Sequence, residues 1–243
     1  MKIRTYVDLP LKTNDKFELP PNIFRHLIKV LRLSINDEFY IFNGQGGNFK
    51  AQLISVDKKK AMAQIGELFS DPHTNLQKIH LAQAVSRGDR MDFALQKAVE
   101  LGVNEITPVF SDNSTVKLRE ERLQNKIRHW QEVIISATEQ CGRTDLAILN
   151  KPLSFSQLVT STPPSSHKII LDPSSDQSFA SLGSLNKGIQ IMIGPESGFT
   201  QTELNLAQEC DFIPIKLGPR VLRTETATMA AITTIQVLFG DMA

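Results

Sequence analysis

From residue 78 onward, short apolar runs alternate with longer segments that are typical of helices. KIHLAQAV, EITPVF, HKIILD, IQIMIG and FIPIKLG have the length and composition of strands, and HKIILD and IQIMIG are continuously apolar in their centres. Between or after them lie the predicted helices RMDFALQKAVELG, residues 119–141, TQTELNLAQEC and TATMAAITTIQVLF. Strands that alternate with helices pack as a parallel sheet covered by helices. The sequence therefore predicts an α/β domain with a mainly parallel sheet over residues 73–243.

The first seventy residues have a different pattern, in which strands and turns predominate. DEFYIFNG and NFKAQLISV are rich in aromatic and β-branched residues, and the turn NGQGG between them indicates a hairpin. AMAQIGEL is a further candidate strand, and NIFRHLIKVLRL has the apolar spacing of a helix. We expect a small β-barrel with one helix over residues 1–72, followed by a linker in the polar stretch 70–75.

Composition excludes several classes of protein. Of the 243 residues 41% are hydrophobic and the formal net charge is +1, whereas a disordered chain is less apolar and more highly charged. No apolar run approaches the ~18 residues of a membrane span, and MKIRTYVDLP lacks the apolar core of a signal peptide. Two cysteines are too few for a disulfide framework or a cysteine-based zinc site. We expect a cytoplasmic globular protein without metal or membrane contact.

The charges are unevenly distributed along the chain. Residues 1–70 contain 11 Lys and Arg against 7 Asp and Glu, whereas residues 151–243 contain 6 against 8. A basic segment joined to a slightly acidic one suggests that the first part binds a polyanion. An ordinary solvated surface is the alternative explanation, and charge alone favours it.

Two strand ends carry the most informative segments. IMIGPESGFT and LGPRVLRTETAT both place Gly-Pro directly after a predicted buried strand and before a helix. Ligands of open α/β sheets bind in the crevice beyond the carboxyl ends of the strands, so two such loops can form one pocket. Two ordinary strand-to-helix turns explain the spacing equally well.

The motifs that the chain lacks exclude several classes of ligand for such a pocket. The chain has no G-x-G-x-x-G after a strand and no G-x-x-x-x-G-K-[ST], which argues against a dinucleotide or a nucleoside triphosphate. It also lacks a G-x-S-x-G elbow, and its five histidines are scattered. A ligand without phosphates, held by main-chain amides and apolar walls, fits these constraints.

Together, GPESGFTQTEL, LGPRVLRTETA, DRMDFALQKAVELGV, ATEQCGR and RHLIKVLRL resemble the ribosomal RNA small subunit methyltransferase E family, and they occur in the same order as in that family. The family belongs to the SPOUT class of S-adenosyl-L-methionine-dependent enzymes. The resemblance implies a PUA-like amino-terminal barrel and a carboxyl-terminal domain with a trefoil knot that binds this cofactor. It also implies a homodimer that methylates N3 of one uridine in the decoding region of 16S rRNA, in the small ribosomal subunit.

The resemblance also assigns a cofactor site. The family's loop reads Gly-Pro-Glu-Gly-Gly-Phe, and this chain has Ser197 at the fourth position, which costs on the order of 1 kcal/mol if φ there is positive. The implied cofactor-binding residues are Leu171, Gly194, Pro195, Glu196, Gly198, Leu217, Gly218, Leu222 and Thr226.

Methylation of a uridine nitrogen requires an aligned nucleophile and the loss of the N3 proton. Cations near the pyrimidine stabilise the negative charge that develops on it. Arg223 is our candidate for that cation, Arg220 is a second one, and Glu225 is the candidate base. An acid in the first turn of a helix, stabilised by the helix dipole, explains Glu225 as well.

Basic residues without an acidic partner are the candidate RNA contacts. Arg25, His26, Lys29 and Arg32 are expected to share much of one helix face, and Arg4 adds a phosphate contact. Arg87 and Arg90 follow a predicted strand and are placed to approach the target nucleotide. A solvated helix face is the alternative for the first group.

Two other functions remain open at this point. One is a methyltransferase of the same class that modifies another rRNA position or a tRNA. The other is a non-catalytic RNA-binding assembly factor, which the intact GPE, LGPR and RTETA segments disfavour.

Overall fold

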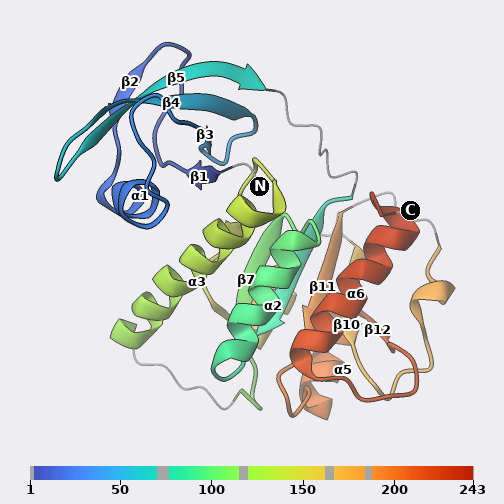
Figure 1. Ribbon diagram of the computed structural model, residues 1–243. Coiled ribbons are helices and arrows are strands. Elements are labelled where there is room, and N and C mark those ends of the chain that lie inside the picture. Colours follow the sequence, from blue (N-terminus) through green and yellow to red (C-terminus); the bar gives the residue numbers. More distant parts are fainter. Residues whose placement is uncertain (1–2, 70–76, 115–119, 162–166, 184–187, 243) are drawn as a thin grey trace. The chain divides into compact units, whose positions relative to one another are not determined.

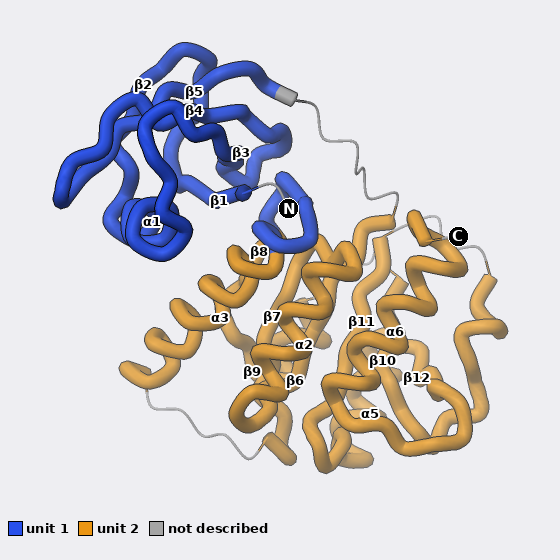
Figure 2. The backbone as a smooth tube through the Cα atoms, in the orientation of Figure 1, with its two compact units in different colours: residues 1–74, 138–146 blue, residues 75–137, 147–243 orange. Residues whose placement is uncertain are grey.

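The computed structural model describes residues 3–69, 77–114, 120–161, 167–183 and 188–242 (Figure 1). The predicted linker at 70–75 lies outside these residues. The chain forms two compact units, one of residues 1–74 with 138–146 and one of residues 75–137 with 147–243 (Figure 2). The predicted limits of the two functional domains, 1–72 and 73–243, stay a prediction.

Unit 1 is built on a five-stranded sheet. Its strands are β1 (Arg4–Tyr6), β2 (Lys16–Glu18), β3 (Glu38–Phe42), β4 (Asn48–Val56) and β5 (Ala61–Phe69), in the order β1-β3-β4-β5-β2. The predicted hairpin is confirmed, because β3 and β4 pair antiparallel and Gly44, Gly46 and Gly47 in the turn all have positive φ. The apolar side chains of these strands pack with Ile23, Phe24 and Leu27 in one core.

The predicted helix of unit 1 is present, but its second part is not an α-helix. After α1 (Pro21–Phe24) the chain continues as the π-helix η1 (Arg25–Val30), in which the Leu31 amide donates to His26 O at 2.9 Å. The segment ends at Arg32, whose φ of 60° is left-handed. The prediction that Arg32 shares the helix face of Arg25 and Lys29 is therefore wrong. All the same, Arg25, His26, Lys29 and Arg32 are exposed.

Arg4 is engaged within unit 1. Its guanidinium donates to the main-chain oxygens of Thr138, Glu139 and Arg143, at 3.2, 3.2 and 2.6 Å. It also donates to Asn48 Oδ1 at 3.1 Å and lies 4.9 Å from the centre of the Phe42 ring. These contacts occupy the group that a phosphate would need, so Arg4 fastens residues 138–146 to the sheet of unit 1.

Unit 2 contains the predicted parallel sheet. Its strands are β6 (Ile79–Ala84), β7 (Glu105–Phe110), β8 (Ile148–Leu149), β9 (Leu153–Ser154), β10 (His167–Leu171), β11 (Ile189–Ile193) and β12 (Ile213–Ile215). The order is β12-β10-β11-β6-β7-β8, with β9 also on β7, and each pairing is parallel. The α/β prediction is confirmed, whereas the trefoil knot stays a prediction.

Helices cover both faces of this sheet. They are α2 (Asp89–Glu100), α3 (Glu120–Cys141), α4 (Phe155–Ser161), α5 (Gln201–Glu209) and α6 (Thr224–Phe239), with the short helix η2 (Phe179–Ser181). Helices α2 and α6 lie side by side (Figure 1). Side chains of α4 and α5 pack on Ala82, Val109, Ile170 and Met192 of the sheet. Among the described helices none is long and apolar enough to cross a membrane.

Candidate functional site

A cavity of about 330 Å³ lies at the carboxyl ends of β10 and β11. It is lined by residues 171–174 after β10, by residues 193–199 after β11, by Leu204 of α5, and by a last segment, the chain that enters α6. This last segment contributes Val221, Leu222, Thr224 and Ala227. The two Gly-Pro loops identified in the sequence therefore meet at one cavity, on the edge of the sheet where α/β proteins bind ligands.

The first loop is a tight turn that is fixed at both ends. The Gly198 amide donates to Pro195 O at 2.9 Å, and Gly198 has a φ of 71°, which a glycine adopts without strain. Ser197 is not among the residues with positive φ, so the serine at this position costs no backbone strain. Instead, the Ser197 hydroxyl donates to the main-chain oxygen of Asn113 at 3.2 Å, while the side-chain amide of Asn113 donates to Gly198 O at 3.1 Å.

Gly194 is required by a close approach. A Cβ atom there would lie 3.3 Å from the ring of Phe199, which itself lies against Phe155 with ring centres 5.3 Å apart. After Phe199, Thr200 and Glu203 form the predicted capping box of α5. The other Glu203 oxygen accepts from the Asp112 amide at 2.9 Å, so this carboxylate joins the loop after β7 to the loop after β11.

A buried polar network connects this loop to α6. Gln83, on β6 and fully buried, donates from Nε2 to Thr224 Oγ1 at 3.0 Å, and its Oε1 accepts from Thr228 Oγ1 at 2.7 Å. Thr224 in turn donates to Gly194 O at 2.7 Å. One glutamine thus sets the positions of the loop 194–198 and of the first turn of α6.

Glu196 is held by the loop after β6 and by the first turn of α2. Its Oε1 accepts from the Arg90 guanidinium at 3.0 Å and from the Arg87 amide at 3.4 Å. Burial alone would raise the pKa of Glu196, but the main-chain amides of Glu196 and Arg87 and the charge of Arg90 outweigh it. The pKa therefore lies below its ordinary value of 4.5.

This lowered pKa predicts a pH-dependent stability. A carboxyl group whose pKa is lower in the folded protein stabilises the fold above its unfolded pKa, and the contribution is lost as pH falls through the folded value. We therefore expect Glu196→Gln to lower the melting temperature at pH 7, and we expect this difference to become smaller as the pH falls from 7 to 3. Thermal unfolding from pH 3 to 7 measures this, with the exposed Glu209→Gln as control. An equal difference at both pH values would contradict the assignment.

The three catalytic candidates are next to the cavity in sequence but do not line it. Arg220 and Arg223 are exposed, and Arg223 is the N-cap of α6 without a side-chain capping bond. Glu225 lies in the first turn of α6, and its Oε2 is buried with no hydrogen-bond partner among the described residues.

The structure separates the nine predicted cofactor residues into two groups. Leu171, Gly194, Pro195, Glu196, Gly198 and Leu222 line the cavity, whereas Leu217, Gly218 and Thr226 do not. Sequence reasoning missed Asp172, Pro173 and Ser174, which extend the end of β10. The signal for them was the Asp-Pro pair directly after the apolar run HKIIL, at the same sheet edge as Leu171. Nothing in the sequence indicated Gln83.

Two family models match the chain. One, described as an RNA methyltransferase domain, covers residues 73–236, and the other, an RNA methyltransferase PUA domain, covers residues 19–65. The parallel sheet, its cavity and these matches define a SPOUT-class RNA methyltransferase with an amino-terminal PUA-like domain. No group of three or more metal-ligating side chains occurs in the described part of the chain.

The relatives give a finer identification. The chain is 37% identical over 241 residues to ribosomal RNA small subunit methyltransferase E of Buchnera aphidicola from Acyrthosiphon pisum, covering 98% of this chain and 94% of the relative. The Bacillus subtilis protein of the same name is 29% identical over 237 residues, which is 93% of each chain. The chain belongs to the ribosomal RNA small subunit methyltransferase E family.

Solved structures agree with this family. The Neisseria gonorrhoeae enzyme of that name, bound to S-adenosylmethionine, matches with a TM-score of 0.94, 35% identity and full coverage of both chains. A Legionella pneumophila protein, described as a methyltransferase in complex with the bound cofactor SAM, matches with a TM-score of 0.95, 35% identity and 99% coverage of both chains. S-adenosylmethionine is the cofactor.

The cavity fits this cofactor. Leu171, Ile193 and Leu222 would provide apolar contacts for a purine ring, and the loop 194–198 would offer main-chain groups to the cofactor without the bulk of a Cβ at Gly194 or Gly198. The carboxylate of Asp172 also lines the cavity, and it suits a ligand that carries positive charge.

Proposed function

We propose that this protein methylates N3 of a uridine in the decoding region of 16S rRNA, within the assembled small ribosomal subunit of the cytoplasm. The observation that carries the proposal is the cavity formed by both Gly-Pro loops, in a chain that matches the family over nearly its whole length. A non-catalytic assembly factor would have no need to keep the two loops fixed by Asn113, Gln83 and Arg90.

In this proposal the loop 194–198, Leu171 and Leu222 hold S-adenosylmethionine, with Leu217, Gly218 and Thr226 supporting the second loop. The bound cofactor supplies an electrophilic methyl group. Glu225 takes the N3 proton, and its unpartnered Oε2 supports this role. Arg223, assisted by Arg220, stabilises the negative charge that develops on the pyrimidine.

The residues that we propose as RNA contacts are basic and have exposed side chains. Arg25, His26, Lys29 and Arg32 present their side chains to solvent on unit 1, and Arg87 does so on unit 2. Phosphate contacts of this kind position an RNA without reading its sequence. Arg90 already pairs with Glu196 at 3.0 Å, so in our proposal it links RNA binding to the cofactor loop. Arg4 is assigned the structural role described above.

We further propose that the protein is a homodimer through α2 and α6. Helix α6 is apolar on its buried side and also exposes Val237 and Leu238 by 46% and 50%, and Phe93 of α2 is 40% exposed. Val221, which lines the cavity, is 82% exposed. Large exposed apolar side chains on these two neighbouring helices support an interface there, and a second copy of the chain would cover them.

The dimer proposal predicts that Leu238→Glu separates the subunits. A charge at a buried apolar interface is strongly unfavourable, so we expect a mass near 27.1 kDa for the variant and twice that for the wild type. Sedimentation equilibrium measures both, and Thr202→Glu on the exposed side of α5 is the control. A monomeric wild-type protein would refute the proposal.

The substrate proposal predicts methyl transfer to small subunits from cells that lack this protein. With labelled S-adenosylmethionine, we expect one methyl group on N3 of one decoding-region uridine, located by mass spectrometry. Because unit 1 carries a modest basic surplus, we expect at least tenfold slower transfer to protein-free 16S rRNA. Label at another base or in tRNA would overturn the substrate alone, and cofactor binding without any transfer would favour the assembly factor. Equal rates on naked rRNA would overturn the preference for the assembled subunit.

A further inference from the structure

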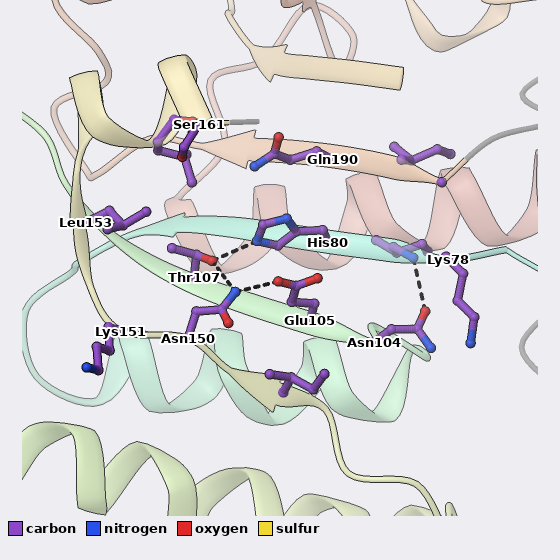
Figure 3. Close-up of a pocket in the computed structure, with 15 residues that line it drawn as sticks. Lys78, His80, Asn104, Glu105, Thr107, Asn150, Lys151, Leu153, Ser161 and Gln190 are labelled. Carbon is purple, nitrogen blue, oxygen red and sulfur yellow. Dashed lines mark hydrogen bonds between the residues drawn. The ribbon is translucent and has the colours of Figure 1, made fainter. Parts of the chain in front are cut away.

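A second and larger cavity lies at the opposite end of the sheet of unit 2. It has a volume of about 680 Å³, within the range of small-molecule sites, and it is formed at the amino-terminal ends of β6, β7 and β11 (Figure 3). We call it the amino-edge pocket. Apart from Ile79, Ile148, Leu153, Leu158 and Ile189, the side chains around it are mostly polar.

The floor of the amino-edge pocket is a hydrogen-bonded polar cluster, where strands of a parallel sheet are usually apolar. His80 Nε2 lies 2.7 Å from Thr107 Oγ1, and the Asn150 amide donates to Glu105 Oε1 at 2.6 Å and to Thr107 Oγ1 at 2.8 Å (Figure 3). Burial lowers the pKa of His80, against the opposing charge of Glu105, so the imidazole is neutral near pH 7. These groups are held in place before any ligand binds.

One acceptor in this floor has no partner. Gln190 is 1% exposed and lines the pocket, and its Oε1 is buried without a hydrogen bond to any described residue. Buried polar atoms are nearly always paired, so an unpaired acceptor on a residue that lines a cavity points to a ligand that donates to it once the side chain turns toward the cavity. The Glu105 carboxylate, on the same floor, adds further acceptor capacity.

The mouth of the pocket is positively charged, whereas the floor offers hydrogen-bond acceptors. Lys78 and Lys151, both exposed, lie on either side of the pocket in Figure 3. The pocket thus has a floor of acceptors, apolar walls that include Leu153 and Ile189, and a basic mouth. A ligand that fits all three has N–H donors for the floor, flat apolar faces for the walls and an anionic group for the lysines.

We propose that the amino-edge pocket binds a mononucleotide whose base carries an exocyclic amino group, with Gln190 Oε1 and the Glu105 carboxylate accepting from that base and Lys78 or Lys151 contacting the phosphate. The pocket is separate from the cofactor cavity, since the two share no lining residue. The proposal does not depend on which RNA the protein methylates.

Titration calorimetry with AMP, CMP and UMP tests this on the full-length protein. The protein is first saturated with S-adenosylhomocysteine, so that adenosine groups do not enter the cofactor cavity. We expect AMP and CMP to bind, and UMP, which has no exocyclic amine, to bind at least tenfold more weakly. Absence of AMP and CMP binding at millimolar concentration, or equal binding of all three, would overturn the proposal.

Variants locate the binding. Gln190→Met keeps the side-chain volume and removes the acceptor, and we expect it to weaken CMP at least tenfold. Lys78→Met with Lys151→Met changes only exposed groups, so folding is not at risk, and it should weaken CMP several-fold but leave cytidine unchanged. Lys216→Met, at the carboxyl end of β12, is the control for charge and should leave CMP unchanged. Wild-type affinity in both pocket variants would place any nucleotide elsewhere and refute the assignment.

Discussion

Arg223→Ala is expected to lower kcat for methyl transfer by roughly 100- to 1,000-fold, while the KM for S-adenosylmethionine stays near that of the wild type. Removing one preorganised group that stabilises charge in a transition state has effects of this size. The side chain is exposed and makes no capping bond to α6, so the fold and the cofactor cavity do not depend on it. Single-turnover kinetics on small subunits separates the chemical step from binding.

Two further variants sharpen this result. Arg223→Lys keeps the charge and should recover part of the rate, whereas Arg122→Ala, on the exposed side of α3, should leave it unchanged. The melting temperature of Arg223→Ala should equal that of the wild type. Wild-type turnover in Arg223→Ala would remove this residue from the mechanism, and Arg220→Ala would then be the next variant to measure.

Gln83→Leu is expected to raise the KM for S-adenosylmethionine at least tenfold and to lower the free energy of unfolding by about 2 kcal/mol. The substitution removes the hydrogen bonds to Thr224 and Thr228, each of which contributes about 1 kcal/mol. Because Thr224 also holds Gly194 O, the cofactor loop loses its support. Cofactor titration and urea unfolding measure the two effects.

The matched control for Gln83 is Gln236→Leu. Gln236 is equally buried, but its amide donates to Leu101 O near the other end of α6, away from the cavity. We expect a similar loss of stability with an unchanged KM. Gln83→Glu keeps the acceptor for Thr228 but loses the donor to Thr224, so it should not restore the cofactor affinity. Equal KM changes in the two leucine variants would show that Gln83 acts through stability alone.

Much of the fold was predictable because periodicity reports burial. The runs HKIIL and IQIMI became adjacent parallel strands, and the glycine-rich turn after Phe42 became a hairpin. The π-helix at Arg25–Val30 was not predictable, because Phe24 and Leu27 are buried as an α-helix would bury them, and the two kinds of helix differ in main-chain hydrogen bonds. The division of the chain was also hidden, since residues 138–146 join unit 1 through Arg4.

The candidate site was predictable where a loop motif carries the geometry. Six of the nine cofactor residues line the cavity, and they belong to the strand ends and Gly-Pro loops themselves. Gln83 was not predictable, because a glutamine within a strand gives no sign of the two threonines, 141 and 145 residues later, that it contacts. The role of Arg4 was also not predictable. Arginine is typical of protein surfaces, but here its guanidinium is partly buried and hydrogen-bonds to the main chain of Arg143.

Position 203 shows how a fold limits the drift of a sequence. Glutamine replaces glutamate freely in most capping boxes. Here, however, Glu203 uses both oxygens as acceptors, one from the Thr200 amide and one from the Asp112 amide. A glutamine would have to turn its NH₂ group toward one of these N–H groups, and two donors would then face each other in a buried place. The replacement of glutamate by glutamine, which is neutral at most other helix starts, is therefore expected to be selected against at position 203.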